Sequence, residues 1–204
     1  MNSTTLSACS QSAIESSLEN QGLVIEIGSF NCRITSNTQR LCEPLGQLYG
    51  AYPATLDATG FADFRIHIRA FREKSSSQAE FVWEGITPFP SLPLSQCHPL
   101  FEWGLNWAIA TLSGCEIVIH AAVVEKNGYA LVLPGEPGSG KSTLCAALAL
   151  SDWRLLSDEL TIIDRTTHLV HAFPRPISLK DQSIPLIRSL FPDVFMTKPV
   201  SETR

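Results

Sequence analysis

The apolar positions of the first 97 residues change repeatedly between the spacing of strands and the spacing of helices. Stretches in which every second residue is apolar predict strands, and leucines three or four residues apart predict a helix. The predicted elements are one or two strands at 23–35, a helix at 38–50, a strand from Phe64 to Arg69, a polar loop at 74–78 and a partner strand from Glu80 to Glu84. They predict a small α+β lobe over residues 1–97.

A proline-rich stretch at 86–99 separates this lobe from the rest of the chain. Proline is excluded from helix interiors and central strands, so the stretch is expected to be an extended linker. Its last proline, Pro99, suits the first turn of a helix. That helix is apolar on most sides, so we expect it to be buried, with Trp103 and Trp107 in the core. A second domain is therefore predicted over residues 98–204.

The second domain begins with two apolar runs joined by Asn127-Gly128, a strong signal for a two-residue β-hairpin. With these two residues in the turn, Val124 faces Leu131 and His120 faces Gly135. The predicted elements are strands at 117–124 and 129–133, a helix at 141–150, and strands at 154–157, 160–164 and 169–173.

A phosphate-binding loop follows the hairpin, because the pattern G-x-x-x-x-G-K-[ST] lies between a predicted strand and a predicted helix. Its glycines let backbone N–H groups face a phosphate at the positive end of the helix. Lys141 is expected to contact the outer phosphates, and the Ser142 hydroxyl to bind Mg²⁺. The predicted nucleotide-binding residues are Gly135, Glu136, Pro137, Gly138, Ser139, Gly140, Lys141, Ser142 and Thr143.

Charged residues that follow the next strands are candidates for the chemistry at this loop. Asp158 ends the strand after the loop helix, where a carboxylate can bind Mg²⁺ or accept a proton from an attacking hydroxyl. Glu159 is its neighbour and points the opposite way on a strand, so one of the two faces the phosphates. Arg175 and Lys180 could contact phosphate or acceptor, or could be solvated surface cations. His120 could orient a carboxylate or be a core histidine.

Composition narrows the partners and the compartment. The net charge of −5 and the pI near 5.5 argue against nucleic acid as a partner. The six cysteines form no zinc-binding spacing and are expected to be reduced thiols. The N-terminus lacks the pattern of a signal peptide, and the apolar runs are too short to cross a membrane. We therefore expect a cytoplasmic protein with no membrane partner.

The stretch from His120 through the loop to Leu160 resembles the catalytic domain of HPr kinase/phosphorylase. The closer similarity is to the HPr-kinase-related kinase A group, and it covers residues 22–204. The segments that carry it are Leu48-Tyr49 with Tyr52-Pro53, Phe101–Trp107, His120–Val124, Leu156–Leu160 and Pro174–Lys180.

This resemblance implies an α/β fold with a P-loop kinase core of the HPr kinase and phosphoenolpyruvate carboxykinase type, behind the small α+β lobe. It implies that Asp158 is the catalytic base and that His120 supports it. Glu159 occupies a position where HPr kinases have aspartate. The implied reaction transfers the γ-phosphate of ATP, with Mg²⁺, to a hydroxyl, with a serine of a protein or peptide as the expected acceptor. A homo-oligomer is also implied.

Two other functions are open at this stage. HPr kinases carry acceptor-binding and phosphorolysis elements beyond the P-loop core, so the domain at 98–204 is expected to be incomplete at its C-terminal end. A nucleotide-binding module without phosphotransfer is therefore one alternative. A P-loop ATPase is the other, although the strand at 154–157 is shorter and more mixed than is usual for that class.

Overall fold

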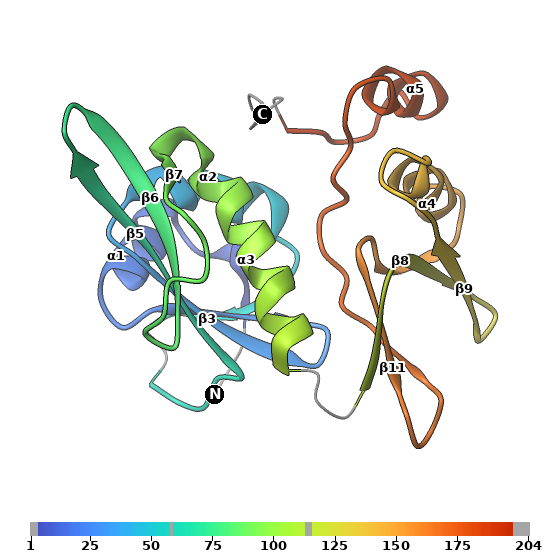
Figure 1. Cartoon of the computed structure of the whole chain (residues 1–204), viewed down its shortest axis with the longest axis horizontal. Helices are drawn as coiled ribbons and strands as arrows, with labels where there is room; N and C mark the ends of the chain where they lie inside the picture. The colour runs from blue at the N-terminus through green and yellow to red at the C-terminus, as the bar shows by residue number, and fades with distance from the viewer. Residues whose placement is uncertain (1–3, 58, 113–115, 198–204) are drawn as a thin grey trace. The chain divides into compact units, whose positions relative to one another are not determined.

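The computed structural model describes residues 4–57, 59–112 and 116–197. Over these ranges it is a mixed α/β structure with two sheets and five α-helices (Figure 1). The described residues up to Ala108 form one compact unit, and Ile109–Thr197 form a second. The predicted division after residue 97 lies at the first residue of helix α3 (Cys97–Leu112), and the division of the structure falls inside that helix.

The first unit is built on a seven-stranded sheet in the order β1-β4-β2-β3-β5-β6-β7. Its strands pair antiparallel, except that β3 and β5 are parallel. Helix α1 begins at the Ser10 cap, whose hydroxyl accepts the Ala13 N–H at 3.2 Å, and packs on β2 and β3. The elements are β1 (Thr4–Thr5), η1 (Leu6–Ala8), α1 (Gln11–Glu19), β2 (Leu23–Ile27), β3 (Phe30–Ser36), η2 (Gln39–Leu41), α2 (Cys42–Leu48), β4 (Pro53–Thr55), β5 (Phe64–Glu73), β6 (Ser76–Trp83), β7 (Leu92–Pro93) and η3 (Leu94–Gln96).

The predicted α+β elements of the first unit are present, with two differences. Strands β5 and β6 extend through the expected polar loop, because Glu73 pairs with Ser76 and the turn is reduced to Lys74 and Ser75. Lys74 adopts the positive φ of 54° that such a turn requires. The expected linker at 86–99 also contributes a short edge strand, β7, which pairs with β6.

Helix α3 confirms the predicted helix, but only one side of it is buried. Trp107 packs edge-on against Trp83 and Phe89, with ring centroids 5.1 and 5.6 Å apart. Trp103 is 43% exposed, so its assignment to the core was wrong. Because Trp103 and Trp107 are separated by about one helical turn, they share a side of the helix, and the packed surface ends between them.

The second unit carries a five-stranded sheet and two helices. Strand β8 is central, with β9, β10 and β11 all paired to it antiparallel, and β12 pairs with β11. The elements are β8 (Glu116–Lys126), β9 (Tyr129–Pro134), α4 (Lys141–Ala149), β10 (Arg154–Ser157), β11 (Leu160–Asp164), β12 (Val170–His171) and α5 (Ser183–Leu190).

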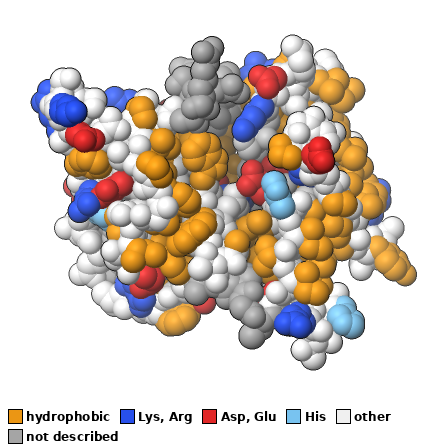
Figure 2. All heavy atoms as spheres, in the orientation of Figure 1, with side chains coloured by type: hydrophobic (Ala, Val, Ile, Leu, Met, Phe, Trp, Pro, Cys, Tyr) orange, Lys and Arg blue, Asp and Glu red, His pale blue; other side chains and the backbone are white. Residues whose placement is uncertain are grey.

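The two apolar strands of the hairpin are less buried than their sequences predict. Tyr129 in β9 is 80% exposed, Leu131 is 40% exposed, and Ile117 in β8 is 48% exposed. Apolar side chains lie open on the surface of the second unit (Figure 2). In the described part of the chain β9 pairs with β8 alone, which leaves its outer side at the edge of the sheet.

The structure bears on two expectations from composition, one about the cysteines and one about the length of the apolar segments. The five cysteines that the structure describes, Cys9, Cys32, Cys42, Cys97 and Cys145, are free thiols. None of the described helices is both long enough and apolar enough to span a bilayer.

We expect Gly104→Ala to destabilise the first unit. A Cβ on Gly104, inside α3, would enter the ring of Phe81 on β6, and overpacking of this kind costs about 1–3 kcal/mol. Gly46→Ala in α2 is the matched control, because no atom lies within 4 Å of its Cβ position. Alanine is the better helix former, so the control should be unchanged or more stable by up to about 1 kcal/mol. Urea unfolding followed by tryptophan fluorescence measures both, and equal effects would contradict the packing described.

Candidate functional site

The phosphate loop and Asp158 meet at one edge of the second sheet because of strand β8. Strands β9 and β10 are each antiparallel to β8 and pair with its opposite sides at Val123, so they run in the same direction. The carboxyl ends of parallel strands lie at the same edge of a sheet. The loop that follows β9 and the carboxylate that follows β10 are therefore neighbours, with β8 between their strands.

The predicted hairpin register is confirmed. Asn127 and Gly128 have φ values of 55° and 82°, as a type I′ turn requires, and Lys126 pairs with Tyr129. The ladder between β8 and β9 runs to Ala121 and Pro134. His120 is thus the next residue of β8 after the ladder, at the level of the first glycine of the loop.

The predicted phosphate loop connects β9 to the start of helix α4 (Figure 1). Gly138 and Gly140 have φ values of 82° and 90°, which L side chains rarely adopt. The Gly140 carbonyl accepts the first helical hydrogen bond, from Leu144 N–H at 2.9 Å. The N–H groups of the first turn of α4 therefore face outward at the positive end of the helix.

Lys141 lies across its own loop. Its Nζ donates to the carbonyl oxygens of Gly135 at 2.6 Å and Glu136 at 3.0 Å. A Cβ on Gly135 would lie 2.6 Å from the Ser139 hydroxyl, so a larger residue there would displace the Ser139 side chain. The lysine is held at the mouth of the loop, where the sequence analysis expects it to meet phosphate.

Asp158 lies where the pairing of β8 with β10 and β11 is interrupted. Ser157 pairs with Val123 and Leu160 pairs with His120, so the last residue of β10 and the whole of β11 share one register along β8. Asp158 and Glu159 lie between these pairs and leave the ladder as a bend. The irregularity that changes the register lies just before them, between Leu155 and Ser157, and irregularities of this kind are frequent beside active sites.

Two buried hydroxyls hold the break in place. The Ser157 hydroxyl accepts the Leu160 N–H at 3.2 Å, and the Thr161 hydroxyl donates to the Ala121 carbonyl at 3.0 Å. Ser157 is 2% exposed and Thr161 is fully buried. Buried backbone groups are costly without partners, so these side chains replace bonds that the interrupted ladder does not supply.

The Asp158 side chain is buried and incompletely bonded. It is 5% exposed, its Oδ2 accepts the Ser178 N–H at 3.2 Å, and its Oδ1 is buried with no hydrogen-bond partner among the described residues. Burial raises the pKa of this carboxyl, and the Ser178 N–H and the Ser142 hydroxyl oppose that rise. A buried carboxylate oxygen without a partner suits a ligand that supplies a positive charge or a proton.

Helix α4 is anchored to the sheet by a small apolar core. Ala122 and Val124 of β8 pack with Cys145 of α4, and their partly buried neighbours are Leu133, Leu148, Trp153, Leu155 and Ile177. Burial, with a smaller contribution from the negative charge of Asp158, raises the pKa of Cys145 to about 12. Its thiol is therefore protonated at neutral pH and serves packing rather than nucleophilic chemistry.

A strap, which we define as residues 172–182, connects β12 to α5 and passes Asp158. Phe173 N–H donates to the Leu156 carbonyl at 2.8 Å, and Ile177 packs on the core beneath α4. Beyond the strap, the Ser183 hydroxyl lies 2.6 Å from the Thr143 hydroxyl, which ties α5 to α4. Ser178, Thr161 and Ser183 were not predicted as site residues. All three follow the acidic pair Asp158-Glu159 in the sequence, which was the available signal.

The four remaining candidates are placed differently. Arg175 lies in the strap, 6% exposed, with its guanidinium 5.3 Å from the Phe173 ring centroid, and its charge lowers the pKa of Asp158. Glu159 is half-buried and its charge raises the pKa of Asp158. Lys180 and His120 are exposed. No hydrogen bond or ion pair joins His120 to Asp158 or to the loop in the described residues, so its supporting role stays a prediction.

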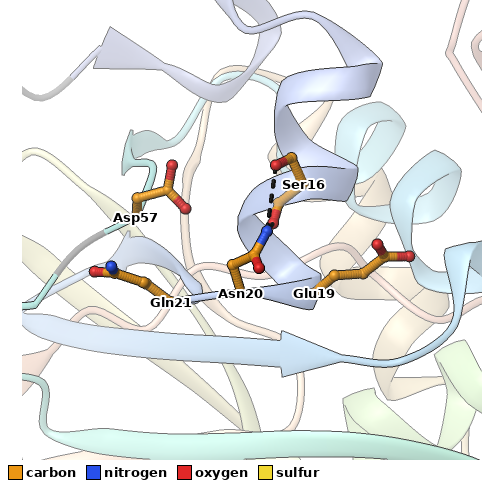
Figure 3. A pocket seen from close by; sticks show the side chains of 5 residues that line it. All are labelled: Ser16, Glu19, Asn20, Gln21 and Asp57. Atoms are coloured by element: carbon orange, nitrogen blue, oxygen red, sulfur yellow. Dashed lines mark hydrogen bonds between the residues drawn. The ribbon is translucent and has the colours of Figure 1, made fainter.

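Open hollows occur on the first unit as well. One, of about 570 Å³, is lined by Ser16, Glu19, Asn20, Gln21 and Asp57, and Figure 3 shows the Asn20 amide bonded back to the Ser16 carbonyl of α1. Within the described ranges no group of three or more histidine, cysteine or carboxylate side chains is arranged to hold a metal ion.

Comparisons with known proteins give no assignment: no family model, no curated protein and no solved structure matches the chain.

We expect Thr161→Val to destabilise the second unit by about 1–3 kcal/mol, because the variant keeps the volume and leaves the buried Ala121 carbonyl without its hydroxyl donor. Thr166→Val, on an exposed turn, is the control and should change the free energy of unfolding by less than about 0.5 kcal/mol. Urea unfolding followed by far-UV circular dichroism compares the two. An unchanged Thr161→Val protein would show that the hydroxyl does not hold the break.

Proposed function

We propose that the second unit is a P-loop kinase core of the HPr kinase type that transfers the γ-phosphate of ATP to a hydroxyl acceptor. The observation that carries the proposal is the sheet edge that the loop and Asp158 share. The strands that precede them, β9 and β10, run in the same direction on either side of β8, and Oδ1 of the buried Asp158 carboxylate has no hydrogen-bond partner among the described residues. A phosphate cradle and a buried carboxylate at one sheet edge are the parts that phosphoryl transfer requires.

The residues present fit Mg²⁺ bound with the nucleotide. The Ser142 hydroxyl and the partner-free Oδ1 of Asp158 are hard oxygen donors, and Mg²⁺ in nucleotide sites is held by one or two such groups together with phosphate oxygens. When bound, the ion would supply charge neutralisation between the β- and γ-phosphates. The other steps belong to residues of this chain.

Lys141 exchanges its two loop carbonyls for phosphate oxygens, while the N–H groups of the loop and of the first turn of α4 bind the phosphates. Asp158 accepts the proton of the attacking hydroxyl. Arg175 adds a buried positive charge beside that carboxylate. The resemblance to HPr kinases supports a serine of a protein or peptide as the acceptor.

We expect Lys141→Ala to weaken Mg·ATP binding by tenfold or more. A hydrogen bond to a charged group contributes about 1.5–3 kcal/mol, and tenfold corresponds to about 1.4 kcal/mol. Lys126→Ala is the matched control, because Lys126 lies at the turn end of the hairpin and pairs with Asp152. Isothermal titration calorimetry measures both. A folded wild-type protein that binds no Mg·ATP would overturn the proposal.

Asp158→Asn should reduce phosphoryl transfer by about 10²–10⁴-fold, the usual contribution of a positioned base, while Mg·ATP still binds. Transfer is measured as ADP formation and as labelled product, with a library of serine and threonine peptides as acceptors. Glu159→Gln tests the neighbouring carboxylate and should have the smaller effect.

Transfer that survives in Asp158→Asn and disappears in Glu159→Gln would move the base to Glu159. Steady phosphate release without labelled peptide would favour an ATPase, and binding without turnover would favour a nucleotide-binding module.

A further inference from the structure

We propose that Ser178 is an internal phosphate acceptor, so that the protein phosphorylates its own strap. The inference rests on the proposed function, because it uses the same loop and the same carboxylate. It adds a modification site at a residue that the sequence pattern does not single out.

The first observation is the distance between Ser178 and Asp158. The Ser178 N–H donates to Oδ2 of Asp158 at 3.2 Å. The hydroxyl oxygen of a serine is only three covalent bonds from its amide nitrogen, so rotation about one bond, χ1, sweeps it past the carboxylate. The residue is also exposed to solvent. A hydroxyl within reach of the base is the geometry that a kinase requires of its acceptor.

The second observation is that Ser178 and the loop lie at the same edge of the sheet. The loop follows β9 and Asp158 follows the parallel strand β10, and the Ser178 N–H donates to Asp158. Ser142 is the second residue of α4, next to Lys141 at the mouth of the loop. The hydroxyl of Ser178 therefore lies at the sheet edge where the γ-phosphate is proposed to bind.

The third observation is that the strap is fastened on both sides of Ser178. Phe173 is hydrogen-bonded to β10, Ile177 is packed beneath α4, and Ser183 is hydrogen-bonded to Thr143. A reacting group that is held in place gains a high effective concentration relative to a free acceptor. Ser183 itself is a poorer acceptor because its hydroxyl already shares a bond with Thr143.

The step balances as an ordinary phosphoryl transfer. The Ser178 hydroxyl oxygen forms a bond to the γ-phosphorus of ATP, and the bond from that phosphorus to the β–γ bridging oxygen breaks. The bridging oxygen leaves with the electron pair as part of ADP, and the hydroxyl proton passes to Asp158. Nothing is oxidised or reduced. The new phosphate carries about −1.5 to −2 charges beside Asp158 and Glu159, so it would repel the strap from the carboxylate.

The test uses the full chain with Mg·ATP and no added acceptor, with digestion by trypsin and mass spectrometry. Because trypsin does not cleave Arg175–Pro176, the peptide of residues 166–180 contains Ser178 as its single serine. Ser178→Ala keeps the N–H to Asp158 and removes the acceptor, whereas Ser178→Thr keeps a hydroxyl. Ser189→Ala, on the exposed side of α5, is the matched control.

We expect one phosphate on Ser178 in the wild type and in Ser189→Ala, at a rate per molecule independent of protein concentration. The Ser178→Ala peptide should carry at least tenfold less phosphate, and Ser178→Thr should carry phosphothreonine. Calorimetry on the same samples distinguishes failure of the internal acceptor from failure of the proposed function. Mg·ATP binding without phosphate on residue 178 overturns this inference and leaves the proposed function standing, whereas absence of Mg·ATP binding overturns both. Phosphate that persists in the Ser178→Ala peptide, or a rate that rises with protein concentration, overturns the internal acceptor.

Discussion

The backbone hydrogen bonds between β8 and the β10–β11 strand stop at Asp158 and Glu159, and the place where they stop decides which side chains reach the phosphate loop. In an unbroken ladder, this position would be one more pleat of the sheet. Here the Asp158 carboxylate is instead withdrawn from solvent and accepts the Ser178 N–H. Ser157 and Thr161 compensate for the missing ladder bonds, so one local irregularity and its two hydroxyl supports position the candidate site.

Much of the second unit could be predicted because the sequence patterns that specify its elements are only a few residues long. Asn127-Gly128 specifies both the turn and the register, and the register places His120 at the level of the loop. The glycines of the loop and the strand at 154–157 were likewise visible as short patterns. The expected meeting of loop and carboxylate was also supported by a rule for parallel strands, and it holds here because β9 and β10 are parallel to each other across an antiparallel β8.

The parts that could not be predicted depend on contacts between distant residues. The strap reaches β10 through Phe173 and Leu156 and reaches Asp158 through Ser178, and neither contact follows from a periodic pattern. Trp103 has the composition of a core residue, but its exposure depends on where the packed surface of α3 ends. The two-residue turn at Lys74 was hidden because a polar stretch is compatible with either a loop or exposed strand ends.

The two carbonyl bonds of Lys141 would also affect the entropy of the nucleotide binding that we propose. A free lysine side chain loses as much as about 1.5–2 kcal/mol of rotamer freedom when it is fixed. Here that freedom is already restricted before a ligand arrives, since the ammonium group is bonded to Gly135 and Glu136. Binding then exchanges carbonyl oxygens for phosphate oxygens, with little new ordering of the side chain. The loop is in this sense preorganised, and the lysine contribution to affinity should be mainly enthalpic.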